Sequence, residues 1–190
     1  AVLTVDPPAL LAITLTPEVE IELGNQYLID AQVNIPTADI ASVTWTPSTG
    51  LVCDTCLSTA AMPFSSTEYV LQVISKAGCE ARSTLLLKVD KTRKVYGPNI
   101  FSPNEDGSND FFTIYGDPVS VTRIKSLQVY SRWGEAVYER LDFDPLDTNL
   151  GWDGTFKGQK LNPAVFVWQA VVEFIDGQEE LFTGDVMLKR

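Results

Sequence analysis

The 190-residue sequence contains no histidine, and this absence excludes much of enzyme chemistry. Histidine is the usual general base near neutral pH and the commonest ligand of transition metals. A serine, threonine or cysteine nucleophile would have no histidine partner here. No pair of carboxylates carries a sequence signature typical of glycosidases. We therefore expect no enzymatic activity, and we expect any bound metal to be a hard cation held by oxygen ligands.

Cysteine is also scarce, because the chain has only Cys53, Cys56 and Cys79. This odd number predicts one disulfide and one free thiol in an oxidising compartment. The stretch CDTC has the C-x-x-C spacing of redox proteins, but that chemistry uses a helix N-terminus in a βαβ unit. No helical pattern surrounds these residues, so the disulfide is the better hypothesis. The sequence leaves open which two cysteines form the pair.

The sequence also has few basic residues and no apolar run long enough for a membrane helix. The net charge of -11, with no cluster of lysine or arginine, repels phosphate backbones and argues against nucleic acid as a partner. The richest apolar run, AVFVWQAVVEF, is interrupted by Gln169 and Glu173 and is shorter than the roughly 18 residues of a membrane helix. Residues 1–15 lack a basic region and contain Asp6 and Pro7, so we expect neither a signal peptide nor an anchor there, and no membrane insertion.

What the sequence does contain is period-2 alternation of apolar and polar residues between turn signals, which is typical of antiparallel sandwiches. In residues 27–35 the apolar side chains fall on one face. Trp45 occupies the position of the core tryptophan of Ig-like domains, although the antibody-type cysteine before it is missing. We predict an all-β protein made of two consecutive Ig-like antiparallel β-sandwich domains, and we expect a monomer.

The stretch DKTRK, with four charges in five residues, predicts a solvated linker at residues 91–94. The preceding domain would span residues 1–90 and end in a hairpin whose turn carries Cys79. The following domain would span residues 95–190. Its long final hairpin would turn at Asp176-Gly177, with one unbroken apolar face formed by Phe166, Trp168, Ala170, Val172 and Phe174.

The densest motif is SPNEDGSNDFF at residues 102–112. It partly matches an EF-hand loop, with Gly107 at the turn and Asn104, Asp106 and Asp110 as candidate calcium ligands. Ser102 stands where the template has its first aspartate. The alternative is a tight turn, because Asn and Asp side chains form Asx-turns and tolerate positive φ. A third hypothesis makes the loop part of an address that another protein recognises.

Two other motifs allow two interpretations each. In GWDGTFKGQ, Trp152 would either stack on a ligand or fill the end of a small sandwich. The segment GDVMLKR would be either an ordinary last strand with a basic tip at Lys189 and Arg190, or an edge strand presented to a receptor.

Four stretches in the second half together resemble a known family. VYGPNIFSPNEDGSNDFF, LQVYSRWGEAVYE, WDGTFKGQKLNPAVFVW and GDVMLKR are similar, in this order, to the gliding motility-associated C-terminal domain, the type B sorting domain of the type IX secretion system. The resemblance covers residues 95–190. Residues 1–90 resemble the PKD-like or Ig-like modules that often precede such domains.

The resemblance implies a non-enzymatic signal that components of an outer-membrane translocon recognise after Sec-dependent delivery to the periplasm. The cargo would then be secreted or displayed at the cell surface. The residues that carry the resemblance are Ser102, Pro103, Asn104, Asp106, Gly107, Asn109, Asp110, Arg132, Trp133, Gly134, Trp152, Asp153, Gly154, Gly184 and Asp185. Together with Lys189 and Arg190, those from Asn104 to Gly154 are the predicted partner-binding residues.

The sequence departs from the family pattern at three places. Glu105 replaces a glycine, Gly97 replaces an aliphatic residue, and the segment before Ala164 lacks a glycine that would mark a bulge. We expect a stiffer turn at Glu105. The alternative function is a surface adhesion or carbohydrate-binding module that uses Trp133, Trp152 or exposed aromatic residues of the first domain, with calcium as an optional stabiliser.

Overall fold

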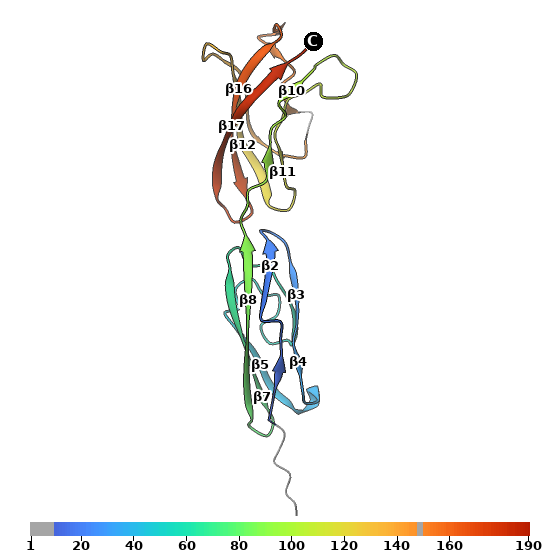
Figure 1. The fold of residues 1–190 in the computed structure, drawn as a ribbon, viewed down its shortest axis with the longest axis vertical. Helices are drawn as coiled ribbons and strands as arrows, with labels where there is room; N and C mark the ends of the chain where they lie inside the picture. Colours follow the sequence, from blue (N-terminus) through green and yellow to red (C-terminus); the bar gives the residue numbers. More distant parts are fainter. Residues whose placement is uncertain (1–9, 148–149) are drawn as a thin grey trace, which may run out of the picture. The chain divides into compact units, whose positions relative to one another are not determined.

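The computed structural model describes residues 10–147 and 150–190, which form two compact units (Figure 1). The first unit ends at Lys91 and the second begins at Thr92. Strands dominate both units, so the all-β prediction is confirmed. Most of the predicted N-terminal segment, residues 1–9, lies outside the described residues. Within the ranges that the structure describes, no helix is long and apolar enough to cross a membrane.

The first unit has eight described strands and one short 3-10 helix. They are β1 (Ile13–Thr14), β2 (Glu18–Glu22), β3 (Tyr27–Asp30), β4 (Gln32–Val33), η1 (Thr37–Asp39), β5 (Ile40–Thr46), β6 (Ser58–Ala61), β7 (Thr67–Ser75) and β8 (Glu80–Asp90). The main sheet has the order β2-β8-β7-β5, and β3 pairs with β6 while β1 pairs with β4. The predicted strand at 27–35 is thus divided between two small sheets.

The core of the first unit forms around Trp45, as the alternation predicts. Trp45 is buried, and its indole Nε1 donates to the Cys56 carbonyl at 2.8 Å. Cys56 is disulfide-bonded to Cys53, which places the closed CDTC loop beside this tryptophan. Cys79 is a free and exposed thiol in the β7–β8 turn.

The second unit has nine described strands. They are β9 (Val95–Tyr96), β10 (Ile100–Phe101), β11 (Tyr115–Gly116), β12 (Val121–Tyr130), β13 (Ala136–Phe143), β14 (Thr155–Phe156), β15 (Gln159–Lys160), β16 (Ala164–Phe174) and β17 (Glu179–Leu188). The main sheet has the order β10-β17-β16-β12-β13, and the long β16–β17 hairpin forms its centre, orange to red in Figure 1. The pairs β9–β11 and β14–β15 are separate two-stranded sheets.

The apolar face predicted for β16 is buried throughout and forms the core of the second unit. The β16–β17 register runs without a shift from Ala164–Leu188 to Glu173–Glu179, so no bulge occurs at Ala164. Each unit contains one parallel pair, β2–β8 and β10–β17. These pairs depart from the purely antiparallel prediction, because alternation within a strand carries no information on the direction of its neighbours.

The prediction of a solvated linker at 91–94 is wrong for Arg93, whose side chain is only 10% exposed. Its guanidinium pairs with Asp176 at 2.8 Å and Glu180 at 3.1 Å, and lies 4.2 Å from the centroid of the Phe174 ring. Desolvation lowers the pKa of Arg93, but the hydrogen bonds to Asp176 and Glu180 raise it above its ordinary value. The chain therefore enters the second unit as a fixed segment beside the β16–β17 turn.

Candidate functional site

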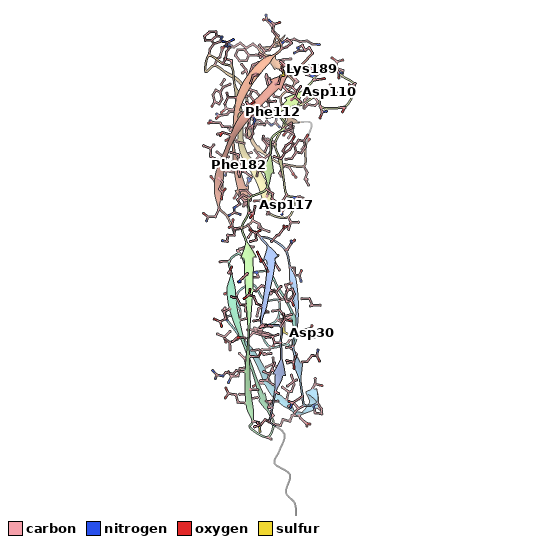
Figure 2. The ribbon with its side chains drawn as sticks, viewed as in Figure 1. Asp30, Asp110, Phe112, Asp117, Phe182 and Lys189 are labelled. Carbon is pink, nitrogen blue, oxygen red and sulfur yellow. A yellow bond between two sulfur atoms is a disulfide. The ribbon has the colours of Figure 1, made fainter. Side chains whose placement is uncertain are left out.

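The motifs that carry the family resemblance lie at one end of the second unit. Leu188 pairs with both Phe101 and Ala164, and Tyr130, the last residue of β12, pairs with Val167. The strand ends that carry the motifs are therefore neighbours. We call this region the motif end and define it as residues 102–111, 131–135, 152–160 and 189–190. In Figure 2, Asp110 and Lys189 are labelled close together at this end of the unit, whereas Asp117 lies toward the other end.

Asp110 organises the first motif loop by accepting hydrogen bonds from three backbone amides. Its Oδ1 accepts from Asn104 at 2.9 Å and Glu105 at 2.7 Å, and its Oδ2 accepts from Gly107 at 2.8 Å. Desolvation raises the pKa of the Asp110 carboxyl, but these amide hydrogen bonds outweigh it and hold the pKa below its ordinary value. The loop is thus built around a carboxylate that stays ionised.

Asp106 and Asn104 form Asx-turns in the same loop. The Asp106 amide donates to Asn104 Oδ1 at 3.2 Å, and the Asn104 side-chain amide donates to Asp106 Oδ2 at 2.8 Å. The Ser108 amide donates to Asp106 Oδ1 at 2.8 Å. A backbone hydrogen bond from Ser102 to the Asn109 carbonyl, 2.9 Å long, closes the loop.

These contacts leave poor conditions for calcium at the three predicted ligands. Both carboxylate oxygens of Asp106 and of Asp110 accept hydrogen bonds, as does the amide oxygen of Asn104. A calcium ion takes six to eight oxygen ligands and would have to replace these bonds. Among the described residues, no group of three or more acidic, cysteine or histidine side chains is placed to hold a metal. The loop fits a self-contained turn better than the calcium site that the sequence offers as an alternative.

The departure at Glu105 lies where the backbone prefers glycine. Glu105 has φ of 66°, and Gly107 and Asn109 have φ of 82° and 55°. Glycine and asparagine adopt this region readily, whereas a glutamate there costs about 1 kcal/mol. The Glu105 amide hydrogen bond to Asp110 holds this conformation.

Trp152 is a core residue, because its side chain is 1% exposed. It packs 5.2 Å from Phe101 and 4.8 Å from Phe166, measured between ring centroids. Its backbone forms two 2.8 Å hydrogen bonds with Phe112, and its indole Nε1 donates to the Thr155 carbonyl. The interpretation of Trp152 as an end plug therefore holds, and the prediction that its side chain contacts a ligand or partner is wrong.

Gly154 is the point where three of the motifs touch. Its φ of 74° needs glycine, and a Cβ atom there would lie 2.9 Å from Leu188 Cδ1 and 3.2 Å from Pro103 Cγ. Beside it lies a cavity of about 230 Å³ with five charged residues in its lining, namely Glu105, Asp110, Asp153, Lys160 and Arg190. The sequence does not single out Glu105 and Lys160 as site residues, although both lie within motifs that carry the family resemblance.

The β12–β13 turn presents the most exposed tryptophan. Trp133 is 84% exposed, and the guanidinium carbon of Arg132 lies 5.0 Å from its ring centroid. The Ser131 amide donates to the Glu135 carbonyl at 2.9 Å, and Gly134 has φ of 80°. A short, fixed turn thus holds an aromatic and a cationic group in solvent, the combination common at protein-binding hot spots.

Of the two interpretations of GDVMLKR, the open edge strand is wrong for Met187 and Leu188. Strand β10 covers them in parallel, with Met187 donating to the Asn99 carbonyl and Lys189 to the Phe101 carbonyl, both at 2.9 Å. A backbone partner on this side blocks strand addition there. Lys189 itself has an exposed side chain and remains a candidate contact.

Gly184 and Gly97 lie against Trp168 of the core. A Cβ atom would lie 2.7 Å from Trp168 Cζ2 at Gly184 and 2.4 Å from it at Gly97. Both glycines therefore make room for the indole, which gives the departure at Gly97 a physical reason. Asp185, the neighbour of Gly184, is exposed.

Comparison with known proteins assigns this unit to a family. Residues 95–188 match the family model of the CHU_C type IX secretion signal domain, so the second unit belongs to that family. No curated protein matches the chain.

Several solved structures resemble this chain weakly. Dimeric latent PorU from Porphyromonas gingivalis is 13% identical with a TM-score of 0.34, and the match covers 93% of this chain but only 20% of PorU. The SrpA adhesin from Streptococcus sanguinis (8% identity, TM-score 0.42) is matched over 93% of each chain. The Ig1-2 module of Drosophila DLAR (8%, TM-score 0.34) is matched over 95% of this chain and 100% of its own. Likeness at this level carries no information on function.

Proposed function

We propose that the second unit is a non-enzymatic export signal that outer-membrane components of the type IX secretion system recognise at the motif end. The family is a type IX secretion signal domain, which supports a role in secretion and sorting. The cargo would be the protein segment joined upstream, and it would reach the cell surface or the medium by way of the periplasm.

The observation that carries this proposal is the placement of the motifs. Residues far apart in the sequence, at 102–111, 131–135, 152–160 and 189–190, share one end of the unit. The chain enters at Arg93, beside the β16–β17 turn, and this turn is at the opposite end of the sheet. A receptor can therefore bind the motif end while the cargo leaves from the other end.

A reporter fusion tests the proposal directly. The 190-residue chain, placed after a Sec leader and a fluorescent protein, should carry the reporter to the surface or medium of a host that has this secretion system. The same fusion without residues 92–190 should stay in the periplasm. Equal periplasmic retention of both fusions would refute the proposal.

A matched pair of variants localises the recognition surface. Trp133→Ala removes an exposed aromatic side chain at the motif end, and Tyr96→Ala removes another, 62% exposed, from β9. Because neither is buried, both variants should keep the melting temperature of the parent. Export should fall several-fold for Trp133→Ala and stay unchanged for Tyr96→Ala. Equal export of the two variants would remove Trp133 from the surface.

For the first unit we propose a spacer without its own chemistry. Trp45 lies in its hydrophobic core, and the disulfide-bonded Cys53–Cys56 loop lies beside this tryptophan. A compact domain of this kind is suited to separating the cargo from the signal. Replacing residues 10–90 by an unrelated Ig-like domain should leave export of the reporter unchanged. A loss of export would assign a recognition role to this unit.

The alternative of an adhesion or carbohydrate-binding module rests on Trp133 alone at the motif end, since Trp152 is buried. Glycan-array binding that Trp133→Ala abolishes would favour it. Binding that survives this substitution would point to the exposed aromatic residues of the first unit.

A further inference from the structure

Arg190 and Lys189 are adjacent in sequence but differ in what their side chains do. Arg190 Nε donates to the Leu161 carbonyl at 2.9 Å, and its Nη2 donates to the Gly154 carbonyl at 3.0 Å. The Lys189 backbone amide donates to the Phe101 carbonyl, and among the described residues no hydrogen bond or ion pair of its exposed side chain is found. The two basic residues therefore cannot be treated as one basic tip.

The two carbonyls that Arg190 joins lie at the base of the β14–β15 hairpin. Gly154 precedes β14 and Leu161 follows β15, and the Leu161 amide donates to the Gly154 carbonyl at 3.0 Å. Arg190 thus bridges the same two residues that close the hairpin. A guanidinium suits this position because its fork of N–H groups can reach two acceptors at once.

This hairpin needs support from outside. Each of its strands has two residues, and Lys157 and Gly158 in its turn have φ of 51° and 76°. A two-stranded hairpin is marginally stable alone in water. The hairpin carries Lys160, which lines the cavity beside Gly154. It also carries Lys157, whose Nζ lies 3.9 Å from Oε1 of Glu135 in the β12–β13 turn. A shift of the hairpin would therefore move charges at two of the motifs.

We propose that Arg190 is a positioning residue of the motif end: its guanidinium holds the base of the β14–β15 hairpin and so fixes where Asp153, Lys157 and Lys160 are presented. Lys189, by contrast, offers its charge directly to the partner. This inference rests on the proposed function for its consequence in export, but its structural part is tested independently.

The structural test is amide hydrogen exchange on the full 190-residue chain. Arg190→Gln should raise the exchange rate of the Leu161 amide about tenfold, because the charged hydrogen bonds at the hairpin base are lost. The melting temperature should stay near that of the parent, since the core is untouched. Lys189→Gln is the matched control and should leave Leu161 exchange unchanged. Unchanged exchange in Arg190→Gln would overturn the proposal.

The export test separates position from charge. Arg190→Lys keeps the positive charge but lacks the two guanidinium N–H groups that reach Leu161 and Gly154. It should therefore raise the hydrogen-exchange rate of the Leu161 amide and lower export of the reporter fusion several-fold. Full export of Arg190→Lys together with faster exchange would overturn the positioning role in recognition. If the parent fusion is not exported, the proposed function fails, and the exchange experiment alone decides the role of Arg190.

Discussion

At the scale of single residues, the packing of Trp168 depends on two glycines. Gly97 and Gly184 come from separate segments and both contact the indole ring. Added atoms at such close contacts force neighbouring side chains out of their rotamers, because protein interiors are close-packed. The sequence shows these glycines, but only the fold shows which ring they accommodate.

We predict that Gly184→Ala lowers the free energy of unfolding of the second unit by about 1–3 kcal/mol, because of overpacking against Trp168. Urea unfolding followed by tryptophan fluorescence measures the loss. Asp185→Ala, at the exposed neighbour, should change stability by less than about 0.5 kcal/mol. If both substitutions had the same effect, the close contact with Trp168 would not determine stability here.

The Asp110 carboxylate predicts a pH dependence of its loop. Its pKa is lowered in the folded protein, so its hydrogen bonds are complete above the ordinary carboxyl pKa of about 4 and are lost as the pH falls through the depressed folded value. NMR titration should show the Glu105 and Gly107 amide signals moving together below pH 4. Asp110→Asn should remove this transition, whereas Asp106→Asn should keep it. A transition that survives in Asp110→Asn would assign it to another group.

At the scale of elements, the loop at 102–111 raises the question of calcium. Because the oxygens of Asp106 and Asp110 already accept hydrogen bonds, we expect no change in melting temperature when millimolar calcium is added. Differential scanning fluorimetry of the full chain tests this. A rise of several degrees that is lost in both Asp106→Ala and Asp110→Ala would instead establish the calcium site.

The Cys53–Cys56 loop offers a second prediction for an element. A disulfide that closes so short a loop contributes about 2 kcal/mol to stability in the chain-entropy estimate. Cys53→Ser should therefore lower the free energy of unfolding of the first unit by this amount, measured by urea unfolding. Cys79→Ser is the control and should leave it unchanged, since Cys79 is a free, exposed thiol. A larger loss in Cys79→Ser would contradict the pairing.

The strands could largely be predicted from the sequence because alternation is local. The buried face of β16 and the core position of Trp45 follow from residues a few positions apart. Strand β10 could not be found in this way, since two residues are too short to show a period. The burial of Trp152 was also open, because the same motif suits an exposed ring.

The candidate site was predictable to a similar extent. The Asx-turns of Asn104 and Asp106 arise from neighbours in sequence, so composition indicates them. The bridge from Arg190 to Gly154 spans 36 residues, and the ion pair of Arg93 with Asp176 spans 83. No local pattern encodes such contacts, which exist only once the sheet has formed.

At the scale of the whole molecule, Arg93 ties the entering chain to the second unit. We predict that Arg93→Ala lowers the free energy of unfolding of this unit by about 2–3 kcal/mol, because it removes the charged hydrogen bonds to Asp176 and Glu180 and the contact with the Phe174 ring. Urea unfolding of the full chain measures the effect. Arg140→Ala, at an exposed arginine of β13, should be neutral. A neutral Arg93→Ala would contradict this role and favour the solvated linker that the sequence predicts.

The parallel pairs β2–β8 and β10–β17 have a mechanical consequence. Each pair joins an early strand of its unit to the last one, in the same direction, with five paired residues from Glu18–Leu86 to Glu22–Asp90 in the first unit and two in the second. Tension applied along the chain therefore loads the hydrogen bonds of a pair together, in shear, and does not peel them one by one. A chain of this construction is suited to being pulled by one end while the other end is held.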